Sequence, residues 1–194
     1  SVHTEYSMLE CAARLTDLFS EAARMGMPAL AMTDHGNLYG AYDFYKRGKA
    51  AGVKAIIGIE GYLTPGTHRT DKTRVKYGDG GRDDVSGSGA YTHMTMWARD
   101  NTGMHNLFRM SSLASLEGFY FKPRLDRGLL STYSAGLIGT TGCVGGEVQT
   151  RLRFGQYREA LEAAADLRDI FGSGNFFAEV MDHGLPIERQ TQRE

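Results

Sequence analysis

Cysteine, proline and long apolar runs are scarce in this sequence, and each shortage disfavours a class of protein. The 194-residue chain has four prolines and two cysteines, Cys11 and Cys143, which lie far apart and in no paired motif. So few cysteines in a chain of this length favour two thiols in a reducing cytosol over a disulfide in a secreted protein. No run approaches the roughly 18 apolar residues of a membrane span, and no signal peptide stands at the start. We therefore expect a soluble, cytoplasmic protein without a membrane partner.

A strong charge of either sign is also missing. The formal net charge is −1, which excludes a basic tail and argues against non-specific nucleic-acid binding as the whole function. A local basic patch can still bind DNA. Because 41% of the residues are hydrophobic and no internal repeat or low-complexity tract is present, we expect one domain with its own core over residues 1–194.

The apolar pattern alternates between helices and strands. Helices are predicted over residues 12–25, 41–50, 104–116, 126–133 and 157–171, and strands over residues 29–32, 55–59, 91–98, 136–140 and 176–180. Gly26 is expected to end the first helix in a left-handed conformation. The last helix is expected to present one apolar face, made of Tyr157, Leu161, Ala164, Leu167 and Phe171. This β-α-β rhythm predicts an α/β fold with a parallel sheet or barrel.

Residues 64–89 break the rhythm and are predicted to form a long loop. They include six glycines, five lysines or arginines and four aspartates, without periodicity, and loops of this length tend to be functional or disordered. The basic residues Arg69, Lys72, Arg74 and Lys76 either contact the phosphates of a DNA strand or are merely solvated, and both interpretations stay open. His68 is expected to be solvated.

Metal-ligand side chains fall at strand ends. His35, Glu60, Cys143 and His183 each lie at or just past the C-terminal end of a predicted strand, which is the edge where α/β barrels assemble their active sites. Any one of them alone is more often a structural hydrogen-bond donor or a buried thiol. Four strand ends in succession indicate a shared site.

His93 opens its predicted strand instead of closing it. No helix is predicted between Glu60 and residue 91, so the two flanking strands can be antiparallel and joined by the long loop. The start of the second strand, with His93, would then lie at the same edge as Glu60. A parallel arrangement of these two strands would contradict the hypothesis.

Imidazole, thiolate and carboxylate ligands suit zinc or a similar borderline divalent ion. Manganese or magnesium would suit a more carboxylate-rich site with water ligands. No paired Cys-x-x-Cys motif is present, so spacing alone is weak evidence for metal. Two or three ions held close together polarise a phosphoryl oxygen, generate hydroxide at neutral pH and stabilise the leaving oxygen, as phosphodiester hydrolysis requires.

A series of segments carries a resemblance to a known family. They are VHTEYSML (2–9), MTDHGN (32–37), IIGIE (56–60), DDVSGSGAYTH (83–93), TTGC (140–143), GEVQTR (146–151) and MDHG (181–184). Over essentially its whole length, the chain resembles the N-terminal PHP domain of bacterial replicative DNA polymerase III alpha subunits. The resemblance implies a distorted seven-stranded β/α barrel with metals at its C-terminal rim. It also implies the DNA primer 3′ end and the other polymerase III holoenzyme subunits as partners.

The resemblance further implies a set of ligands. By position in the family's motifs the metal ligands are His3, Glu10, His35, Glu60, His93 and Cys143, of which His35, Glu60 and His93 are expected to be catalytic. Glu10 stands where the family usually has Asp, and its extra methylene displaces the carboxylate oxygens. Cys11 replaces the usual Gly, which removes a permissive backbone position. Ser1 stands in the place of another His.

Two further residues are expected to support the ligands. His183 is not a metal position of the family and is expected to be structural or to orient a ligand, and Asp34 is expected to orient a neighbouring ligand. The family's final Asp-x-His pair would lie beyond Glu194, and barrels of this general kind take roughly 250 residues. We therefore expect a partial PHP domain, which is either a fragment or a protein shortened at both ends.

Three functions remain open at this point. The first is an exonuclease domain that uses a metal cluster to hydrolyse the 3′-terminal phosphodiester and so proofreads the primer. The second is a degenerate, non-catalytic scaffold of the polymerase, as in family members whose site has decayed. The third is a stand-alone phosphatase of the same superfamily, which segment 83–93 disfavours because it resembles the polymerase specifically. Ser1 and the missing C-terminal pair count against activity in this chain as it stands.

Overall fold

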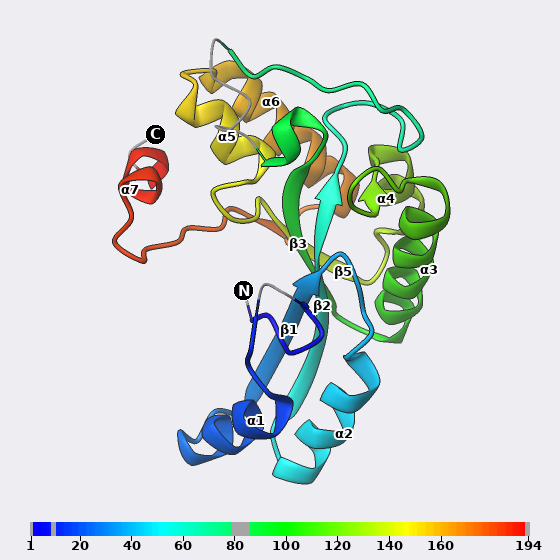
Figure 1. Cartoon of the computed structure of the whole chain (residues 1–194), viewed down its shortest axis with the longest axis vertical. Helices are drawn as coiled ribbons and strands as arrows, with labels where there is room; N and C mark the ends of the chain where they lie inside the picture. The colour runs from blue at the N-terminus through cyan, green and yellow to red at the C-terminus, as the bar shows by residue number, and fades with distance from the viewer. Residues whose placement is uncertain (1, 9–10, 79–85, 193–194) are drawn as a thin grey trace.

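The computed structural model describes residues 2–8, 11–78 and 86–192 of the chain. In these ranges, α-helices and strands alternate for most of the length (Figure 1). The helices are α1 (Leu15–Arg24), α2 (Ala41–Ala51), α3 (Asn101–Glu117), α4 (Arg127–Tyr133), α5 (Glu147–Arg153), α6 (Tyr157–Phe171) and α7 (Pro186–Gln192), with a 3₁₀-helix η2 (Ser86–Gly89). The strands are β1 (Ala29–His35), β2 (Lys54–Leu63), β3 (Thr92–Ala98), β4 (Arg124–Leu125), β5 (Leu137–Thr140) and β6 (Phe176–Phe177).

The strands form one sheet in the order β1-β2-β3-β5-β6, and β4 pairs with the end of β2 beyond the point where β1 stops. Strand β3 is antiparallel to both β2 and β5, whereas the other pairs are parallel. The start of β3 therefore lies at the same edge as the C-terminal ends of the other strands. The predicted antiparallel arrangement is confirmed.

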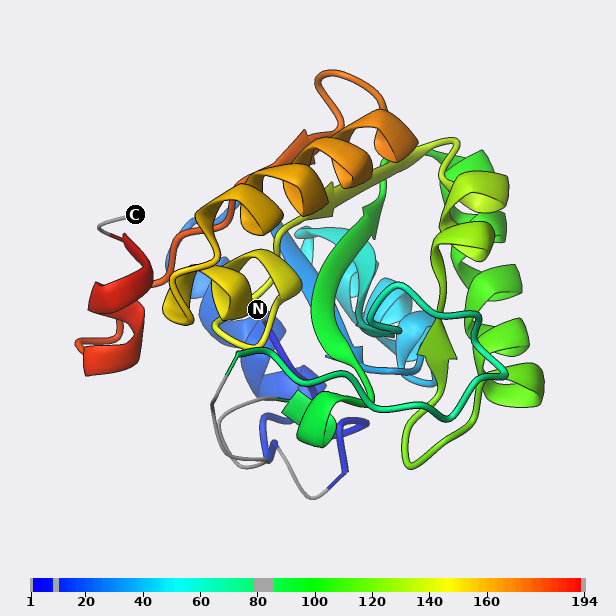
Figure 2. The same cartoon turned by 90° about the horizontal axis from the view of Figure 1, so that it is seen from above.

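Side chains alternate between the two faces of this sheet. Met32, Ile57 and Met96 share one face and belong to the buried core. Helices α1, α2, α3 and α6 pack against the strands, and Figure 2 shows helices around the outside of the curved sheet. The alternate residues, among them His35 and Glu60, point to the other face. The period of two thus separates the apolar core from the candidate ligands.

Three strands differ from their predictions by three residues or more, and the first of them, β1, continues to His35. Strand β2 continues to Leu63, so Glu60 and Tyr62 lie inside the strand and not at its end. Strand β6 covers only Phe176 and Phe177. Strand β2 is longer because it has partners on both edges, with β3 along one and β1 followed by β4 along the other.

Helix α6 has the predicted bounds but buries a different face. Its buried residues are Ala160, Ala163, Leu167 and Phe171, whereas Tyr157 and Leu161 of the predicted face are exposed. Alanines at the buried positions let the helix approach its neighbours closely, which apolarity alone does not indicate. Gly26 has a φ of +69° just after α1, as predicted.

The α/β class is confirmed, and the described residues form six strands in an open sheet. The closed, seven-stranded barrel stays a prediction. Helices α5 and α7 and the short strand β4 were not predicted from the sequence, because each is too short to show a clear period. No helix in the described ranges combines the length and the apolar character that crossing a membrane requires.

Candidate metal centre

Candidate ligands from β1, β2 and β3 converge at one edge of the sheet. His35 is the last residue of β1 and pairs in register with Glu60 of β2. His93, the second residue of the antiparallel strand β3, pairs with Tyr62, two residues further along β2. Because residues two apart share a face of a strand, His35, Glu60 and His93 all project to the same side.

Glu60 lies at the centre of this group and is only 2% exposed. Its Oε1 atom is 2.6 Å from Nδ1 of His93, 3.8 Å from Nδ1 of His35 and 3.7 Å from Sγ of Cys143. Its Oε2 atom is 3.4 Å from Nε2 of His3. Four side chains from four other segments thus meet around one buried carboxylate, so that the cluster has five side chains in all.

These five side chains form two groups that can each hold a metal ion. His3, His35 and Glu60 offer ligand atoms within 4.8 Å of one another, and so do Glu60, His93 and Cys143. Glu60 belongs to both groups, and a carboxylate has two oxygens with which to bridge two ions. The rings of His3 and His35 are stacked with centroids 4.1 Å apart and planes inclined by 15°. If both groups held ions, Glu60 would be a ligand of each.

The donor atoms fit a borderline divalent cation. Imidazole nitrogens, a thiol and a carboxylate are the ligands that zinc takes in proteins. Nδ1 of His3 is buried, and no group among the described residues forms a hydrogen bond with it. A buried polar atom without a partner costs free energy, so this nitrogen is a further reason to place a cation here.

The charges of the cluster shift two pKa values strongly. Burial alone would raise the pKa of Glu60, but the hydrogen bond from His93 and the charges of the three imidazoles outweigh burial and lower it to about 2. Burial alone would lower the pKa of His93, but its bonds to Cys143 and Glu60 outweigh burial and raise it to about 9. The imidazoles thus supply the positive charge that keeps the buried carboxylate ionised.

Asp34 fixes the N-terminal segment that carries His3. Its carboxylate accepts hydrogen bonds from the backbone N–H of Thr4 (2.6 Å), the hydroxyl of Thr4 (2.7 Å) and the hydroxyl of Ser7 (2.8 Å). The hydroxyl of Ser7 also accepts from the backbone N–H of His35 (3.1 Å). Sequence analysis missed Thr4 and Ser7, whose only local signal is that two hydroxyl side chains follow His3. Asp34 thus acts on the segment of His3 through the backbone N–H of Thr4 and the hydroxyls of Thr4 and Ser7.

The loop after β5 brings Cys143 to the cluster. Gly142 has a φ of +79°, and a Cβ there would lie 2.8 Å from the carbonyl oxygen of His93. The backbone N–H of His93 donates to the carbonyl of Gly145 (2.9 Å), and the backbone N–H of Gly145 donates to Sγ of Cys143 (3.4 Å). Glycine is required because the loop turns back onto β3 in close contact.

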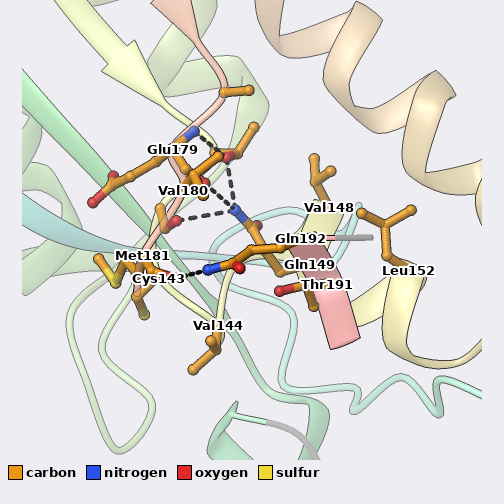
Figure 3. A pocket seen from close by; sticks show the side chains of 13 residues that line it. Cys143, Val144, Val148, Gln149, Leu152, Glu179, Val180, Met181, Thr191 and Gln192 are labelled. Atoms are coloured by element: carbon orange, nitrogen blue, oxygen red, sulfur yellow. Dashed lines mark hydrogen bonds between the residues drawn. The ribbon is translucent and has the colours of Figure 1, made fainter. Parts of the chain in front are cut away.

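A pocket of about 240 Å³ adjoins Cys143 (Figure 3). It lies between α5, α7 and the extended segment after β6, and Val148, Leu152 and Val180 contribute much of its apolar lining. The side-chain amide of Gln149 donates to the hydroxyl of Thr141 (2.7 Å) and to two backbone carbonyls. These bonds fasten α5 to the loop that carries Cys143.

The remaining predicted residues have different environments. Glu10 lies outside the described residues, as do Ser1, Asp83 and Asp84. His183 has a side chain that is 69% exposed, and its Nδ1 lies 2.6 Å from Oε1 of Glu188. This pair joins the residues before α7 to the helix itself, which is a structural role.

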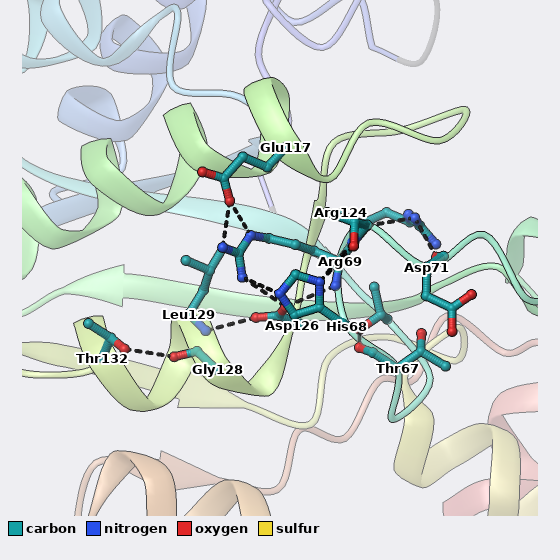
Figure 4. A network of polar contacts seen from close by, with 12 residues as sticks. Thr67, His68, Arg69, Asp71, Glu117, Arg124, Asp126, Gly128, Leu129 and Thr132 are labelled. Carbon is teal, nitrogen blue, oxygen red and sulfur yellow. Dashed lines mark hydrogen bonds and ion pairs between the residues drawn. The ribbon is translucent and has the colours of Figure 1, made fainter.

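The long loop is anchored by a network of charges around Arg69 and Asp126 (Figure 4). Arg69 forms ion pairs with Glu117 (2.5 Å) and Asp126 (3.0 Å), so it is neither solvated nor directed at a DNA strand. Asp126 also caps α4 by accepting from the N–H of Leu129 (2.8 Å). His68 is largely exposed, as predicted, although its Nε2 lies 3.6 Å from Asp126.

Arg124 lies beside this network and is 1% exposed. Its guanidinium donates to the carbonyls of Gly118 (3.1 Å), Ala90 (3.3 Å), Arg69 (2.8 Å) and Asp71 (2.8 Å). Burial lowers the pKa of this group. Arg124 thus connects the end of α3, the start of β3 and the long loop.

Comparison with known proteins gives a consistent family. Residues 1–183 match the PHP domain family. The chain is 58% identical to a DNA polymerase III subunit alpha of Saccharopolyspora erythraea over 98% of its length, 55% identical to one of Mycobacterium tuberculosis over 98%, and 44% identical to one of Thermus aquaticus over 98%. It spans 17%, 16% and 15% of these three relatives, respectively.

Proposed function

The chain belongs to the PHP domain family, and we propose that it is the metal-dependent 3′–5′ exonuclease domain of a DNA polymerase III alpha subunit. The observation that carries the proposal is the sharing of Glu60 between two groups of ligands, one with His3 and His35 and the other with His93 and Cys143. A structural site for a single zinc ion does not require a buried carboxylate that belongs to two groups of ligands. Hydrolysis of phosphodiesters commonly uses paired ions.

In this proposal His3, His35 and Glu60 hold one ion, and Glu60, His93 and Cys143 hold a second. Zn²⁺ fits these nitrogen and sulfur donors better than Mn²⁺ or Mg²⁺ does. Bound ions supply Lewis acidity toward a phosphoryl oxygen and hydroxide at neutral pH. Glu10 remains a proposed ligand, so that a third ion is possible in the complete site.

The protein's own residues hold these ligands in place before any ion arrives. Asp34 holds the segment of His3 through Thr4 and Ser7, and Gly142 allows the loop of Cys143 to lie against β3. Ligands on rigid elements with fixed partners retain their geometry, and loss of such supporting partners typically lowers metal affinity 10- to 100-fold.

The proposed substrate and partners rest on the relatives, which are DNA polymerase III alpha subunits. We therefore propose the primer 3′ end as the substrate, DNA replication as the process, the other polymerase III holoenzyme subunits as partners and the cytoplasm as the location. Removal of a mispaired terminal nucleotide would constitute proofreading.

The proposal is tested on purified protein that includes whatever residues flank this chain in its natural polypeptide. Metal content is measured by mass spectrometry, and release of 3′ nucleotides from a mismatched primer–template is followed with and without added Zn²⁺ or Mn²⁺. We expect bound metal, metal-dependent release, and loss of both in Glu60→Gln. His105→Gln, on the exposed side of α3, is the matched control and should retain both.

Other outcomes would contradict the proposal in distinguishable ways. Metal-free protein without nuclease activity would support the non-catalytic scaffold. Metal-bound protein that hydrolyses a small phosphomonoester but leaves primer–template DNA intact would support the stand-alone phosphatase.

A further inference from the structure

Basic side chains of residues 72–74 contact the aromatic rings of residues 120–121, and the adjacent Lys122 contacts Tyr62 beside the candidate metal centre. We name this group the aromatic–basic platform. Its members are Lys72, Arg74, Tyr120, Phe121 and Lys122. We propose that this platform binds single-stranded DNA and guides its 3′ end to the metal centre. The inference rests on the proposed exonuclease function and assigns it a substrate-binding surface.

The platform begins at the metal centre itself. The ammonium of Lys122 lies 5.4 Å above the ring of Tyr62. That ring contacts the imidazoles of His93, at 5.3 Å between centroids, and His35, at 6.2 Å. Lys122 and His35 also line the same pocket of about 170 Å³, together with Asn37. Lys122 thus places this end of the platform beside the candidate ligands.

The platform continues from Lys122 into two adjacent aromatic residues. The ring of Tyr120 lies 5.9 Å from the ammonium of Lys72 and 5.7 Å from the guanidinium of Arg74, and buried Arg124 lies 5.1 Å from it. The ring of Phe121 lies 5.2 Å from the guanidinium of Arg74. Interleaved cations and aromatic rings are the combination with which proteins hold single strands, because cations track phosphates and rings stack on unpaired bases.

Phe121 has a backbone and an exposure that folding alone does not explain. Its φ is +62°, a conformation that costs free energy for a bulky residue, and its side chain is 64% exposed. Because the ring of Phe121 is exposed to solvent, packing in the core does not compensate the strain in its backbone. Strain of this kind clusters at sites that bind ligands, and base stacking would give the ring a use.

The cations of the platform differ from a neighbour in the same loop. Arg69 is neutralised by Glu117 and Asp126. Lys72 and Arg74 are exposed, and no carboxylate within the described ranges lies at ion-pair distance from either of them. Their charge is therefore available to phosphates, as the DNA-binding interpretation of the loop requires.

The test measures binding without catalysis. Affinity for a 5′-fluorescein oligothymidylate of about 10 nucleotides, a length within the site sizes of single-strand binders, is followed by fluorescence anisotropy in EDTA at several salt concentrations. We expect Phe121→Ala to weaken binding about 5- to 150-fold, as removal of one stacking ring does. We expect Lys72→Gln with Arg74→Gln to weaken binding and to flatten the salt dependence by about 1.4 in slope, because each phosphate that a cation no longer neutralises accounts for about 0.7.

Matched variants distinguish loss of the Phe121 ring from relief of its backbone strain and from the general effect of removing any exposed ring or cation. Phe121→Gly adopts a positive φ without strain, so it should fold at least as well as the wild type yet bind DNA as weakly as Phe121→Ala. Phe108→Ala on α3 and Arg158→Gln on α6 remove an exposed ring and an exposed cation elsewhere and should bind like the wild type. Glu60→Gln should bind DNA normally while losing metal, so that failure of the nuclease and failure of the platform are distinguishable.

A functional readout completes the test. With metal present, the platform variants should lose hydrolysis of primer DNA but retain hydrolysis of bis(p-nitrophenyl) phosphate, which is too small to reach the platform. Unchanged DNA affinity in Phe121→Ala and in Lys72→Gln with Arg74→Gln would overturn the proposal. Equal losses in the Phe108 and Arg158 variants would overturn it as well.

Discussion

Two single charges, Glu60 and Arg124, lie equally deep in this protein but have opposite kinds of partner. Glu60 is surrounded by three imidazoles and a thiol, and only the distance to His93, 2.6 Å, is that of a short hydrogen bond. Arg124 donates to four backbone carbonyls at 2.8 to 3.3 Å. The partners of Glu60 are side chains that can all ligate a metal. The partners of Arg124 are main-chain carbonyls, whose positions are fixed by the fold.

The comparison shows how one fold separates stability from chemistry. A guanidinium has five N–H donors in a fixed fork and no acceptor, so carbonyls satisfy it permanently and join three segments of the chain. A carboxylate among titratable groups stays adjustable, since its neighbours change charge when a cation arrives. We therefore expect changes at Arg124 to act on folding and changes at Glu60 to act on metal binding.

The largest effect is expected at Arg124. Arg124→Met retains volume but removes the side-chain donor from four carbonyls, of which Gly118 keeps the bond from the backbone N–H of residue 124 and Arg69 and Asp71 are only partly buried. Each buried group left unsatisfied costs about 1–3 kcal/mol. Allowing for water reaching some of them, the free energy of unfolding should fall by on the order of 4 kcal/mol, measured by urea denaturation. Arg158→Met on the surface is the control and should leave the unfolding midpoint unchanged. An Arg124→Met midpoint equal to that of the wild type would refute the structural role.

An intermediate effect is expected at Asp34, which supports the metal centre. Asp34→Ala removes an acceptor of three hydrogen bonds and should lower the free energy of unfolding by about 2–3 kcal/mol. It should also weaken zinc binding about 10- to 100-fold, because the segment of His3 loses its anchor. Calorimetric titration with zinc checks the second effect. Exposed Asp169→Asn should change neither quantity, and normal zinc affinity in Asp34→Ala would show that His3 is held by other means.

A small effect on the metal-free protein is expected at Glu60. In EDTA, Glu60→Gln should change the free energy of unfolding by only about 1 kcal/mol, because the amide still accepts a hydrogen bond from His93. Zinc at 100 times its dissociation constant should stabilise the wild type by about 2.7 kcal/mol and leave the variant unaffected. Thermal unfolding with and without zinc measures the difference. Equal stabilisation of both proteins would exclude Glu60 as a ligand.

The smallest effect is expected at His183, which resembles the ligands only in its place after a strand. Its side chain is largely exposed and pairs with Glu188, so His183→Ala should leave metal content and the unfolding midpoint unchanged. Metal analysis and a denaturation curve are sufficient to check this. Loss of metal in this variant would return His183 to the ligand set.

The candidate site was partly predictable because its ligands lie on regular strands. Alternation along residues 29–32, 55–59 and 91–98 is a local signal, and the rule that strand ends meet at one edge is enough to bring His35 and Glu60 together. The antiparallel start of β3 added His93. His3 was predicted only through the family resemblance, since nothing local marks a histidine in an irregular segment as a ligand.

Sequence by itself determined the α/β class, the bounds of α6, the left-handed Gly26 and the edge at which the ligands gather. These features depend on the pattern of residues that are close together in the sequence. Only tertiary structure decided that Glu60 lies inside β2 at the centre of the cluster, that Cys143 reaches it from 83 positions away, and that Arg124 is buried among carbonyls. These contacts join segments distant in sequence, and their energies depend on how the sheet curves and which loops turn back. No period within a segment can specify them.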